Sequence, residues 1–597
     1  MTRNNFKHYS TVVVVVASLI LTTCGDTPST SVSVDQFFSD FTDEWVRRNP
    51  NQAVRYQYFQ GDEQDQLSRE LTPVTREWKE GRILLARKGL EQLASFDKDL
   101  MSDDQQLSAD IMQWQLQSVI DSESFLDYDF PLQQMNGVNV TLTNELAVVH
   151  PIRTQRDAEN YIARLRQVDE RIEEARRESE LQAASGIIPP DFILDATIAS
   201  MELFVSSAPA DNPLVTALAT KMESVSEIEQ SRRTQLVNEA IEIVESEVYP
   251  AWRSALGTLS SQRADATEDA GLWRFEGGDV LYAQRLRAFT TTDLSAEEIH
   301  DIGLREVARI ELEMDRLFQG IGYTDGSIVE RVEQLRAATS YPDTDEGRAL
   351  IMSDIQDYLS DALQRTESSF DIRPKAKVIA QPYPEFRWAN AAASYNGPPA
   401  DGSRPGIFQM PLRPSRLTQF GLRSLVYHET VPGHHFQVAL TIENAELPAF
   451  RQIRALGGLS ASSEGWGLYA ERFAAEDNWY EDDIVGRLGQ LNSELFRARR
   501  LVVDTGLHAM GWTRQQAIDF GIEASEIERY VVMPGQACSY MIGQLKIIEL
   551  RDRAMEELGA RFSLRDYHNQ VLEVGIVPLA ILEQRVDNFI SESLGIE

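Results

Sequence analysis

Cysteine is nearly absent from this sequence, which contains only Cys24 and Cys538 in 597 residues. One pair cannot form the multi-disulfide framework that is typical of small secreted domains. The same scarcity excludes a metal site built from several thiolates. Any metal ion that this protein binds must therefore use histidine and carboxylate side chains.

Positive charge is also in short supply, because 57 basic residues face 93 acidic ones and the formal net charge is -36. Such a surface repels nucleic acid and anionic lipid headgroups, so neither is an expected partner. Hydrophobic residues make up 42% of the chain and aromatic residues 9%, which excludes a disordered protein and provides for a large core.

Long apolar runs are missing as well, and the one notable run lies near the N-terminus, at residues 11–21. It follows Arg3 and Lys7 and is too short to span a bilayer as a helix, which needs about 20 residues. This pattern predicts a secretion signal over residues 1–23, followed by a tether over residues 24–33 that is rich in serine and threonine.

The signal resembles a bacterial lipoprotein leader, in which the cysteine after the cleavage site is lipidated. Thr23 departs from the small residues that usually precede this cysteine. The resemblance implies a lipid anchor on Cys24 as the protein's only link to a membrane. Gly25, rather than aspartate, follows the cysteine, which implies an outer-membrane lipoprotein of the cell envelope that faces the periplasm.

Helical periodicity dominates residues 34–370, where apolar residues recur at spacings of three and four. A capping box at Ser295–Glu298 predicts the start of a helix that continues to Met314. The predicted core faces include two groups, which are Phe37, Phe38, Phe41 and Trp45, and then Leu84, Leu85, Leu90 and Leu93.

The pattern changes between residues 375 and 414, where 377–380 and 406–410 are short strand candidates separated by a loop rich in Pro, Gly and Asn. Helical periodicity returns near residue 415. We therefore predict one mainly α domain over residues 34–597, in which 34–370 forms a cleft and 371–597 carries the chemistry.

The most informative segment is His428-Glu-Thr-Val-Pro-Gly-His-His435, after a helix predicted over residues 416–427. Zinc peptidases commonly place two histidines at i and i+4 on one helical face, with a glutamate base at i+1. Here Pro432 occupies i+4, and on an ideal helix His434 would lie about 240° around from His428. If a bulge loops out two residues, His434 becomes the second ligand, and we prefer this alternative. If the bulge loops out three residues, His435 becomes the second ligand instead.

A third protein ligand is expected from a second helix, because catalytic zinc sites keep three ligands and one open position. The segment Ser463-Glu-Gly-Trp-Gly-Leu-Tyr-Ala-Glu471 provides it. Glu464 is the preferred ligand, since Gly465 and Gly467 allow close helix approach. Glu471 is then placed to orient a histidine ligand from behind. We expect one zinc ion on His428, His434 and Glu464.

Three motifs together resemble the bacterial "domain of unknown function 885" family, which is grouped with the gluzincin metallopeptidases. They are His-Glu-Thr-Val-Pro-Gly-His-His at 428–435, Glu-Gly-Trp-Gly-Leu-Tyr-Ala-Glu at 464–471 and Pro-Gly-Gln-Ala-Cys-Ser-Tyr at 534–540. The resemblance implies a large, mainly helical zincin-like (gluzincin) fold with a small β-sheet beside the site helix.

The expected activity is a zinc metallopeptidase that hydrolyses short peptides, with Glu429 as general base toward the metal-activated water. The resemblance to helical peptidases implies Tyr540 as the donor to the oxyanion, with His435 and His508 as weaker candidates. The strand at 407–410 is expected to bind substrate as an added antiparallel strand. The alternative is a catalytically inactive zincin-fold lipoprotein that binds peptides or cell-envelope components.

Overall fold

The computed structural model describes residues 33–383, 385, 388, 392–399, 402 and 404–596. The predicted leader, Cys24 and all of the tether except Ser33 lie outside these residues. Among the described helices, none combines the length and the apolar character needed to cross a membrane.

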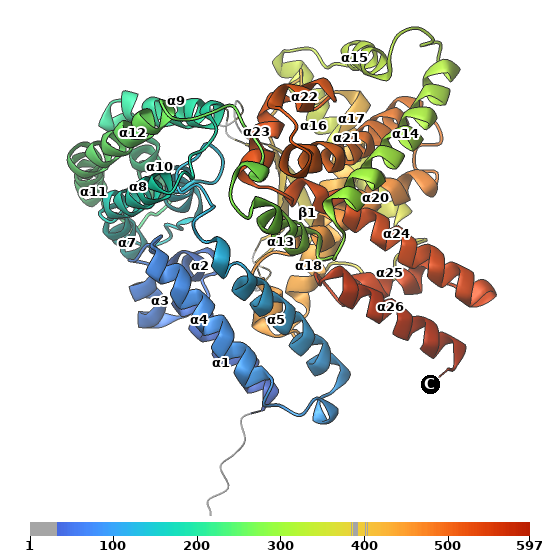
Figure 1. Ribbon diagram of the computed structural model, residues 1–597, viewed down its shortest axis with the longest axis horizontal. Coiled ribbons are helices and arrows are strands. Elements are labelled where there is room, and N and C mark those ends of the chain that lie inside the picture. Colours follow the sequence, from blue (N-terminus) through green and yellow to red (C-terminus); the bar gives the residue numbers. More distant parts are fainter. Residues whose placement is uncertain are drawn as a thin grey trace, which may run out of the picture.

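The N-terminal part of the fold, up to residue 263, is helical, as the periodicity predicts. Five helices come first: α1 (Val34–Arg47), α2 (Pro50–Tyr56), α3 (Gly61–Leu67), α4 (Arg76–Leu93) and α5 (Asp103–Asp121). Seven more follow: α6 (Val138–Asn144), α7 (Gln155–Leu165), α8 (Val168–Ala184), α9 (Asp191–Ser206), α10 (Pro213–Glu223), α11 (Gln230–Ile243) and α12 (Tyr249–Arg263). The helices from α7 to α12 gather on one side of the molecule (Figure 1) and bury their apolar faces in a core of their own.

Four helices and a small sheet then lead to the site. The helices are α13 (Gly278–Thr290), α14 (Ala296–Gly320), α15 (Ile328–Ala338) and α16 (Asp345–Arg365). The predicted capping box is confirmed, because the Ser295 hydroxyl and the Glu298 carboxylate each accept a backbone N–H of the other residue. The strands are β1 (Val378–Pro382), β2 (Ser394–Asn396) and β3 (Gly406–Met410).

The sheet order is β1-β3-β2, with β3 parallel to β1 and antiparallel to β2. Since β3 is bonded on both edges, the prediction that residues 407–410 accept a substrate strand is wrong. The sheet lies beside α18 (His434–Glu443), where a Cβ on Gly397 would be 3.0 Å from the side chains of Val438 and Ile442.

The rest of the chain is helical again. It comprises α17 (Gln419–Glu429), α18, α19 (Ala449–Gln452), α20 (Ser460–Glu476), α21 (Ile484–Ala509), α22 (Arg514–Asp519), α23 (Ala524–Val532), α24 (Ser539–Leu558), α25 (Leu564–Glu573) and α26 (Leu579–Leu594). The predicted start of α17 at Arg416 is three residues early. Arg416 instead lies in the turn before α17, and its side chain forms an ion pair with Glu523.

One large core joins both ends of the chain, because α1, α4 and α5 share it with α25 and α26. Phe38 of α1 packs against Phe450, with ring centroids 5.6 Å apart. The predicted aromatic face of α1 is buried throughout. On α4 the prediction fails at Leu84, which is 68% exposed, because Leu85 and Leu93 occupy the buried face.

Candidate metal centre

The α17–α18 junction deforms the helix between the two candidate histidines. The N–H of Gly433 donates to the carbonyl of Tyr427, six residues earlier, at 3.0 Å, and the N–H of His435 donates to Thr430 at 3.1 Å. A regular α-helix joins residues four apart, so the Gly433 bond accommodates two extra residues. This is the deformation that favours His434 over His435.

Glycine is required at position 433 because the backbone passes so close to α17. A Cβ at this position would lie 1.9 Å from the carbonyl oxygen of His428 and 2.4 Å from that of Tyr427. Trp466 fixes the junction from the neighbouring helix, since its indole N–H donates to the carbonyls of Pro432 at 2.9 Å and Gly433 at 3.2 Å. Nothing in the sequence motif at 464–471 indicates this contact of Trp466.

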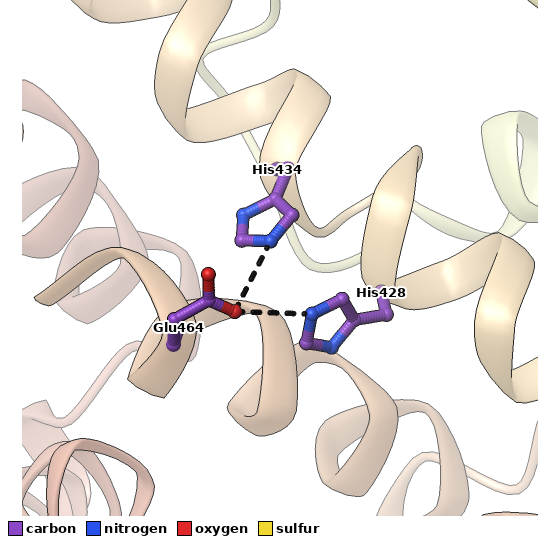
Figure 2. Close-up of side chains that lie close together, drawn as sticks. All are labelled: His428, His434 and Glu464. Carbon is purple, nitrogen blue, oxygen red and sulfur yellow. Dashed lines mark ion pairs between the residues drawn. The ribbon is translucent and has the colours of Figure 1, made fainter. Parts of the chain in front are cut away.

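The deformation brings two histidines onto one carboxylate of α20 (Figure 2). The Oε2 of Glu464 lies 3.4 Å from Nε2 of His428 and 3.5 Å from Nε2 of His434. The two imidazole rings are 4.7 Å apart and nearly perpendicular, at 83°. One ligand atom from each of the three residues lies within 4.8 Å of the others.

These spacings fit a small divalent cation. Tetrahedral zinc with bonds of about 2.0–2.1 Å requires ligand atoms about 3.3–3.4 Å apart. Both nitrogen-to-oxygen distances meet this value within about 0.2 Å. Two imidazoles and one carboxylate also form a donor set that suits zinc, with one coordination position left for water or substrate.

Glu471 orients the first histidine from behind. Its Oε1 accepts a hydrogen bond from Nδ1 of His428 at 2.8 Å, and its Oε2 accepts one from the hydroxyl of Ser424. Glu471 is only 1% exposed. Because the proton lies on Nδ1, the Nε2 lone pair of His428 is directed to the side where Glu464 and His434 meet.

Without a cation, a proton takes its place. Burial opposes protonation of His428, but the hydrogen bonds to Glu464 and Glu471 outweigh it and raise its pKa to about 10. Burial likewise opposes ionisation of Glu464, yet its contacts with His428 and His434 lower its pKa strongly. The cluster therefore concentrates negative charge that favours a cation, and a metal ion would have to displace the proton on His428 in order to bind.

Small residues let α20 pass between two neighbouring helices. A Cβ on Gly467 would lie 2.7 Å from the His428 ring, and one on Gly465 would lie 2.6 Å from the backbone of Gly543 in α24. Gly543 in turn touches the carbonyl of Ala461. The predicted close approach at both glycines is confirmed. Gly467 allows the contact with His428 of α17, whereas Gly465 allows the contact with α24.

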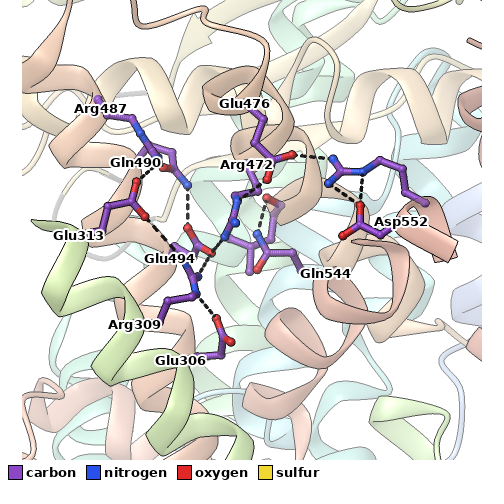
Figure 3. A network of polar contacts seen from close by, with 12 residues as sticks. Glu306, Arg309, Glu313, Arg472, Glu476, Arg487, Gln490, Glu494, Gln544 and Asp552 are labelled. Atoms are coloured by element: carbon purple, nitrogen blue, oxygen red, sulfur yellow. Dashed lines mark hydrogen bonds and ion pairs between the residues drawn. The ribbon is translucent and has the colours of Figure 1, made fainter. Parts of the chain in front are cut away.

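A network of charged groups further fixes α20 (Figure 3). Its centre is the fully buried Glu494 of α21. Glu494 pairs with Arg309 of α14 at 2.6 Å and with Arg472 of α20 at 2.7 Å, and Gln490 donates to it at 3.1 Å. Arg472 directly follows Glu471, so this network holds the end of α20 that orients His428.

Glu429, the predicted base, lies next to His428 at the end of α17 and is 8% exposed. Its negative charge contributes to the raised pKa of His428. Within the described part of the chain, its carboxylate has no hydrogen-bond or ion-pair partner. Glu429 therefore lies beside the cluster, and its carboxylate takes part in no structural contact with the described residues.

The structure places His435 away from the cluster, toward the sheet. Its Nδ1 lies 2.8 Å from the hydroxyl of Tyr395 on β2, and burial lowers its pKa to about 4. His435 is therefore a neutral residue that joins α18 to the sheet and is not a partner of Glu464. Sequence reasoning missed Tyr395, which lies in a loop-like stretch without periodicity.

His508 is also remote from the three-residue cluster. Its Nδ1 accepts the N–H of Leu272 at 3.2 Å, and its Nε2 donates to the carbonyl of Tyr530 at 3.0 Å. Burial lowers its pKa to about 4. Both ring nitrogens are thus used by backbone contacts, which fits a structural role and leaves none for substrate.

Tyr540 is the second residue of α24, the helix packed against α20, and is partly buried. The guanidinium carbons of Arg500 and Arg497 lie 4.6 Å and 6.0 Å from its ring centroid. No described residue is hydrogen-bonded to its hydroxyl. Tyr540 therefore stands in a cationic environment, and its assignment as an oxyanion donor stays a prediction.

A cleft of about 480 Å³ reaches His428 and Glu471. Its walls come mainly from α15, α17 and α21, and Gly521, Glu523 and Glu526 also line it. The helix α15, which belongs to residues 34–370, thus lines the same cleft as α17 and α21.

The fold and the cluster define a mainly helical protein with a His-His-Glu arrangement able to hold a divalent metal ion. Residues 55–586 match the family model described as bacterial protein of unknown function (DUF885), and the chain belongs to this family. No curated protein matches the chain.

Two solved structures are similar to this chain. A presumed lipoprotein from Colwellia psychrerythraea shares 31% identity over 94% of this chain and 100% of its own, with a TM-score of 0.89. A presumed lipoprotein of unknown function from Shewanella oneidensis shares 17% identity over 92% of this chain and 99% of its own, with a TM-score of 0.69. The second likeness extends to the fold alone.

Proposed function

We propose that this protein is a zinc-dependent metallopeptidase that hydrolyses peptide bonds of short peptides. The observation that carries the proposal is the convergence of His428, His434 and Glu464, with Oε2 of Glu464 3.4 Å and 3.5 Å from the two Nε2 atoms. A structural ion pair would not need the second carboxylate, Glu471, that directs the Nε2 of His428 inward.

When bound, zinc would polarise the peptide carbonyl and acidify a water molecule. His428, His434 and Glu464 would hold the ion, and Glu471 keeps His428 in the tautomer that can bind it. Glu429, which no structural contact occupies, accepts the proton of the attacking water and passes it to the leaving amine.

A cell-envelope location is part of the proposal. The leader over residues 1–23 predicts export with a lipid on Cys24, and the two similar solved structures are both described as presumed lipoproteins. The acidic body would then lie on the periplasmic side of the outer membrane, attached through the tether.

The test combines elemental analysis of the purified protein with digestion of a mixed-peptide library. We expect one zinc per chain and cleavage by the parent protein. Glu429→Gln should retain zinc and lose about 10²–10⁴-fold in rate, because general-base catalysis contributes that much. Glu446→Gln is the matched control, since it makes the same chemical change at an exposed position.

Two results would contradict the proposal. If Glu429→Gln keeps its zinc and cleaves as fast as the parent, Glu429 is not the base. If the parent binds zinc and peptides but cleaves none of them, the chain is an inactive binding scaffold.

A further inference from the structure

Asp504 of α21 is a fully buried carboxylic acid that the proposed peptidase chemistry does not use. Its Oδ1 accepts the hydroxyl of Tyr282 at 2.6 Å and the backbone N–H of Gly535 at 2.9 Å. No described arginine, lysine or histidine forms an ion pair with it. A carboxylate removed from water without a cationic partner lowers stability, so this position points to a role beyond packing.

Gly535 lies in a joining segment, residues 533–538, that links α23 to α24 and overlaps the third sequence motif. Its φ is +82°, and a Cβ here would lie 3.1 Å from the backbone of α13. Tyr282 also belongs to α13. Asp504 therefore holds both the joining segment and α13 against α21.

The joining segment also contacts the start of α20. Nε2 of Gln536 donates to the hydroxyl of Ser460 at 3.2 Å, and the hydroxyl oxygens of Ser460 and Ser539 are 2.7 Å apart. Ser460 is the first residue of α20, and Glu464 follows one turn later. The joining segment thus fixes the turn of α20 that precedes a candidate metal ligand.

Helix α24 extends this contact past Glu464. A Cβ on Gly543 would lie 2.0 Å from the carbonyl oxygen of Ala461, and one on Gly465 would lie 2.6 Å from the backbone of Gly543. Glu464 therefore lies between two contacts that α20 makes with the joining segment and α24. Because these are contacts of backbone on backbone, a shift of the joining segment would be transmitted to Glu464.

The groups around Asp504 favour its protonated form. Burial raises its pKa to about 7, against the hydrogen bonds from Tyr282 and Gly535 and then the positive charge of Arg529 in α23. Burial also raises the pKa of Tyr282 and that of the neighbouring Cys538 thiol, so both stay neutral.

Three further titratable groups lie on α21 or on the adjacent α14. The ring of His508 lies 5.1 Å from that of Tyr282, and burial lowers the pKa of His508 to about 4. Arg500, one turn before Asp504, pairs with Glu526. His300 of α14 contacts Thr505, and burial lowers its pKa below 6.5. None of these groups pairs with Asp504.

We propose that Asp504 is a positioning residue of the metal centre. By accepting the N–H of Gly535 it holds the joining segment against α21, and the joining segment holds the turn of α20 that places Glu464. The inference rests on the metal centre of the proposed function and is independent of peptide cleavage.

The test compares Asp504→Leu with Asp504→Asn. Leucine has a similar size and no acceptor, whereas asparagine keeps an oxygen that can accept the N–H of Gly535. Asp504→Leu should weaken zinc binding by about 3- to 10-fold, the value of one net hydrogen bond, and Asp504→Asn should stay within about twofold of the parent. Asp519→Leu is the matched control, since it makes the same change at an exposed position of α22 and should leave zinc affinity unchanged.

Hydrogen exchange of the metal-free protein, read by mass spectrometry, follows the contacts themselves. Asp504→Leu should lose protection in the joining segment and at residues 460–464, while α8, which belongs to a separate core, keeps its protection. If Asp504→Leu does not fold, Ser460→Ala replaces it. That variant should weaken zinc binding and expose residues 460–464 while the joining segment stays protected.

The pH dependence distinguishes the carboxyl group from a merely structural contact. Opening of the joining segment exposes Asp504 to water, where its pKa returns toward 3.8, so opening releases a proton. The closed state is therefore favoured at low pH and loses this advantage as pH rises to about 7. In the parent, protection corrected for intrinsic exchange should fall by up to about tenfold per pH unit between about pH 5 and 7. In Asp504→Asn it should not change with pH.

Three results would overturn the inference: parent-like zinc binding and exchange in Asp504→Leu, equal losses in Asp504→Leu and Asp504→Asn, or the same pH dependence in the parent and Asp504→Asn. A parent that binds no zinc would count against the proposed function, whereas the exchange measurements would still test Asp504. A parent that binds zinc while Asp504→Leu exchanges like it would count against Asp504 alone.

Discussion

Replacing Gly467 with alanine should displace the imidazole of His428 and weaken metal binding. The added Cβ would lie 2.7 Å from Cε1 and 3.0 Å from both ring nitrogens. Ordinary contact begins near 3.4 Å, so the ring or the helix must move by about 0.7 Å. Metal ligands tolerate about 0.2 Å.

Neither partner can retreat easily. The ring is bonded to the buried Glu471 at 2.8 Å, and α20 meets the backbone of Gly543 on its opposite side, where Gly465 already packs at the limit. Overpacking of this kind costs about 1–3 kcal/mol, which corresponds to about 5- to 150-fold in an equilibrium constant. We expect the zinc affinity of the variant to decrease by a factor within that range.

The assay is competition for zinc against a chromophoric chelator, with circular dichroism to verify the fold. Gly257→Ala is the control, because Gly257 lies within α12 with open space around its Cβ position. It should leave zinc affinity unchanged and raise helix stability by about 0.5–1 kcal/mol. If Gly467→Ala binds zinc as tightly as the parent, His428 is not a ligand in this geometry.

Two further predictions concern stability. In the metal-free protein the pKa of His428, about 10, exceeds its ordinary value of 6.5, so the stabilisation is complete below pH 6.5 and is lost as pH rises toward 10. The melting temperature of chelator-treated protein should fall over this range, and His428→Gln should remove most of that decline; an equal decline in the variant would refute the assignment. Glu494→Gln should lower the free energy of unfolding in urea by about 3 kcal/mol, because it leaves two arginines without their shared buried partner. Glu63→Gln, which breaks an exposed pair, should change it by less than about 0.5 kcal/mol, and similar effects of the two variants would mean that the Glu494 network contributes little.

How much of the site could be predicted depended on where the relevant contacts lie along the chain. The residue types at His428, Glu464 and Glu471 and the need for a bulge at Pro432 follow from local chemistry. The number of looped-out residues does not, because the indole N–H of Trp466, more than thirty residues later, helps to set the path of the junction. The choice between His434 and His435 therefore required the three-dimensional fold.

In the sheet, the strand itself could be predicted from the sequence, but its position in the sheet could not. The strand at residues 406–410 was predicted with its observed bounds, since its composition and flanking turns are local signals. Its central position was not, because strand order depends on pairing with β2, a three-residue strand inside a stretch rich in Pro, Gly and Asn. A strand of that length has too little periodicity to be recognised.

The core that α1 shares with the C-terminal half has a consequence for the order in which the chain can fold. The indole N–H of Trp45 donates to the carbonyl of Ala455, 410 residues away along the chain. Contacts of such long range form late, because the intervening chain must first be made and closed into a loop. During synthesis, the side chains of Phe38 and Trp45 therefore stay without these contacts until about two thirds of the protein has followed α1. A product truncated before Phe450 would leave Phe38 and Trp45 without these contacts and would be an expected target for chaperones and proteases.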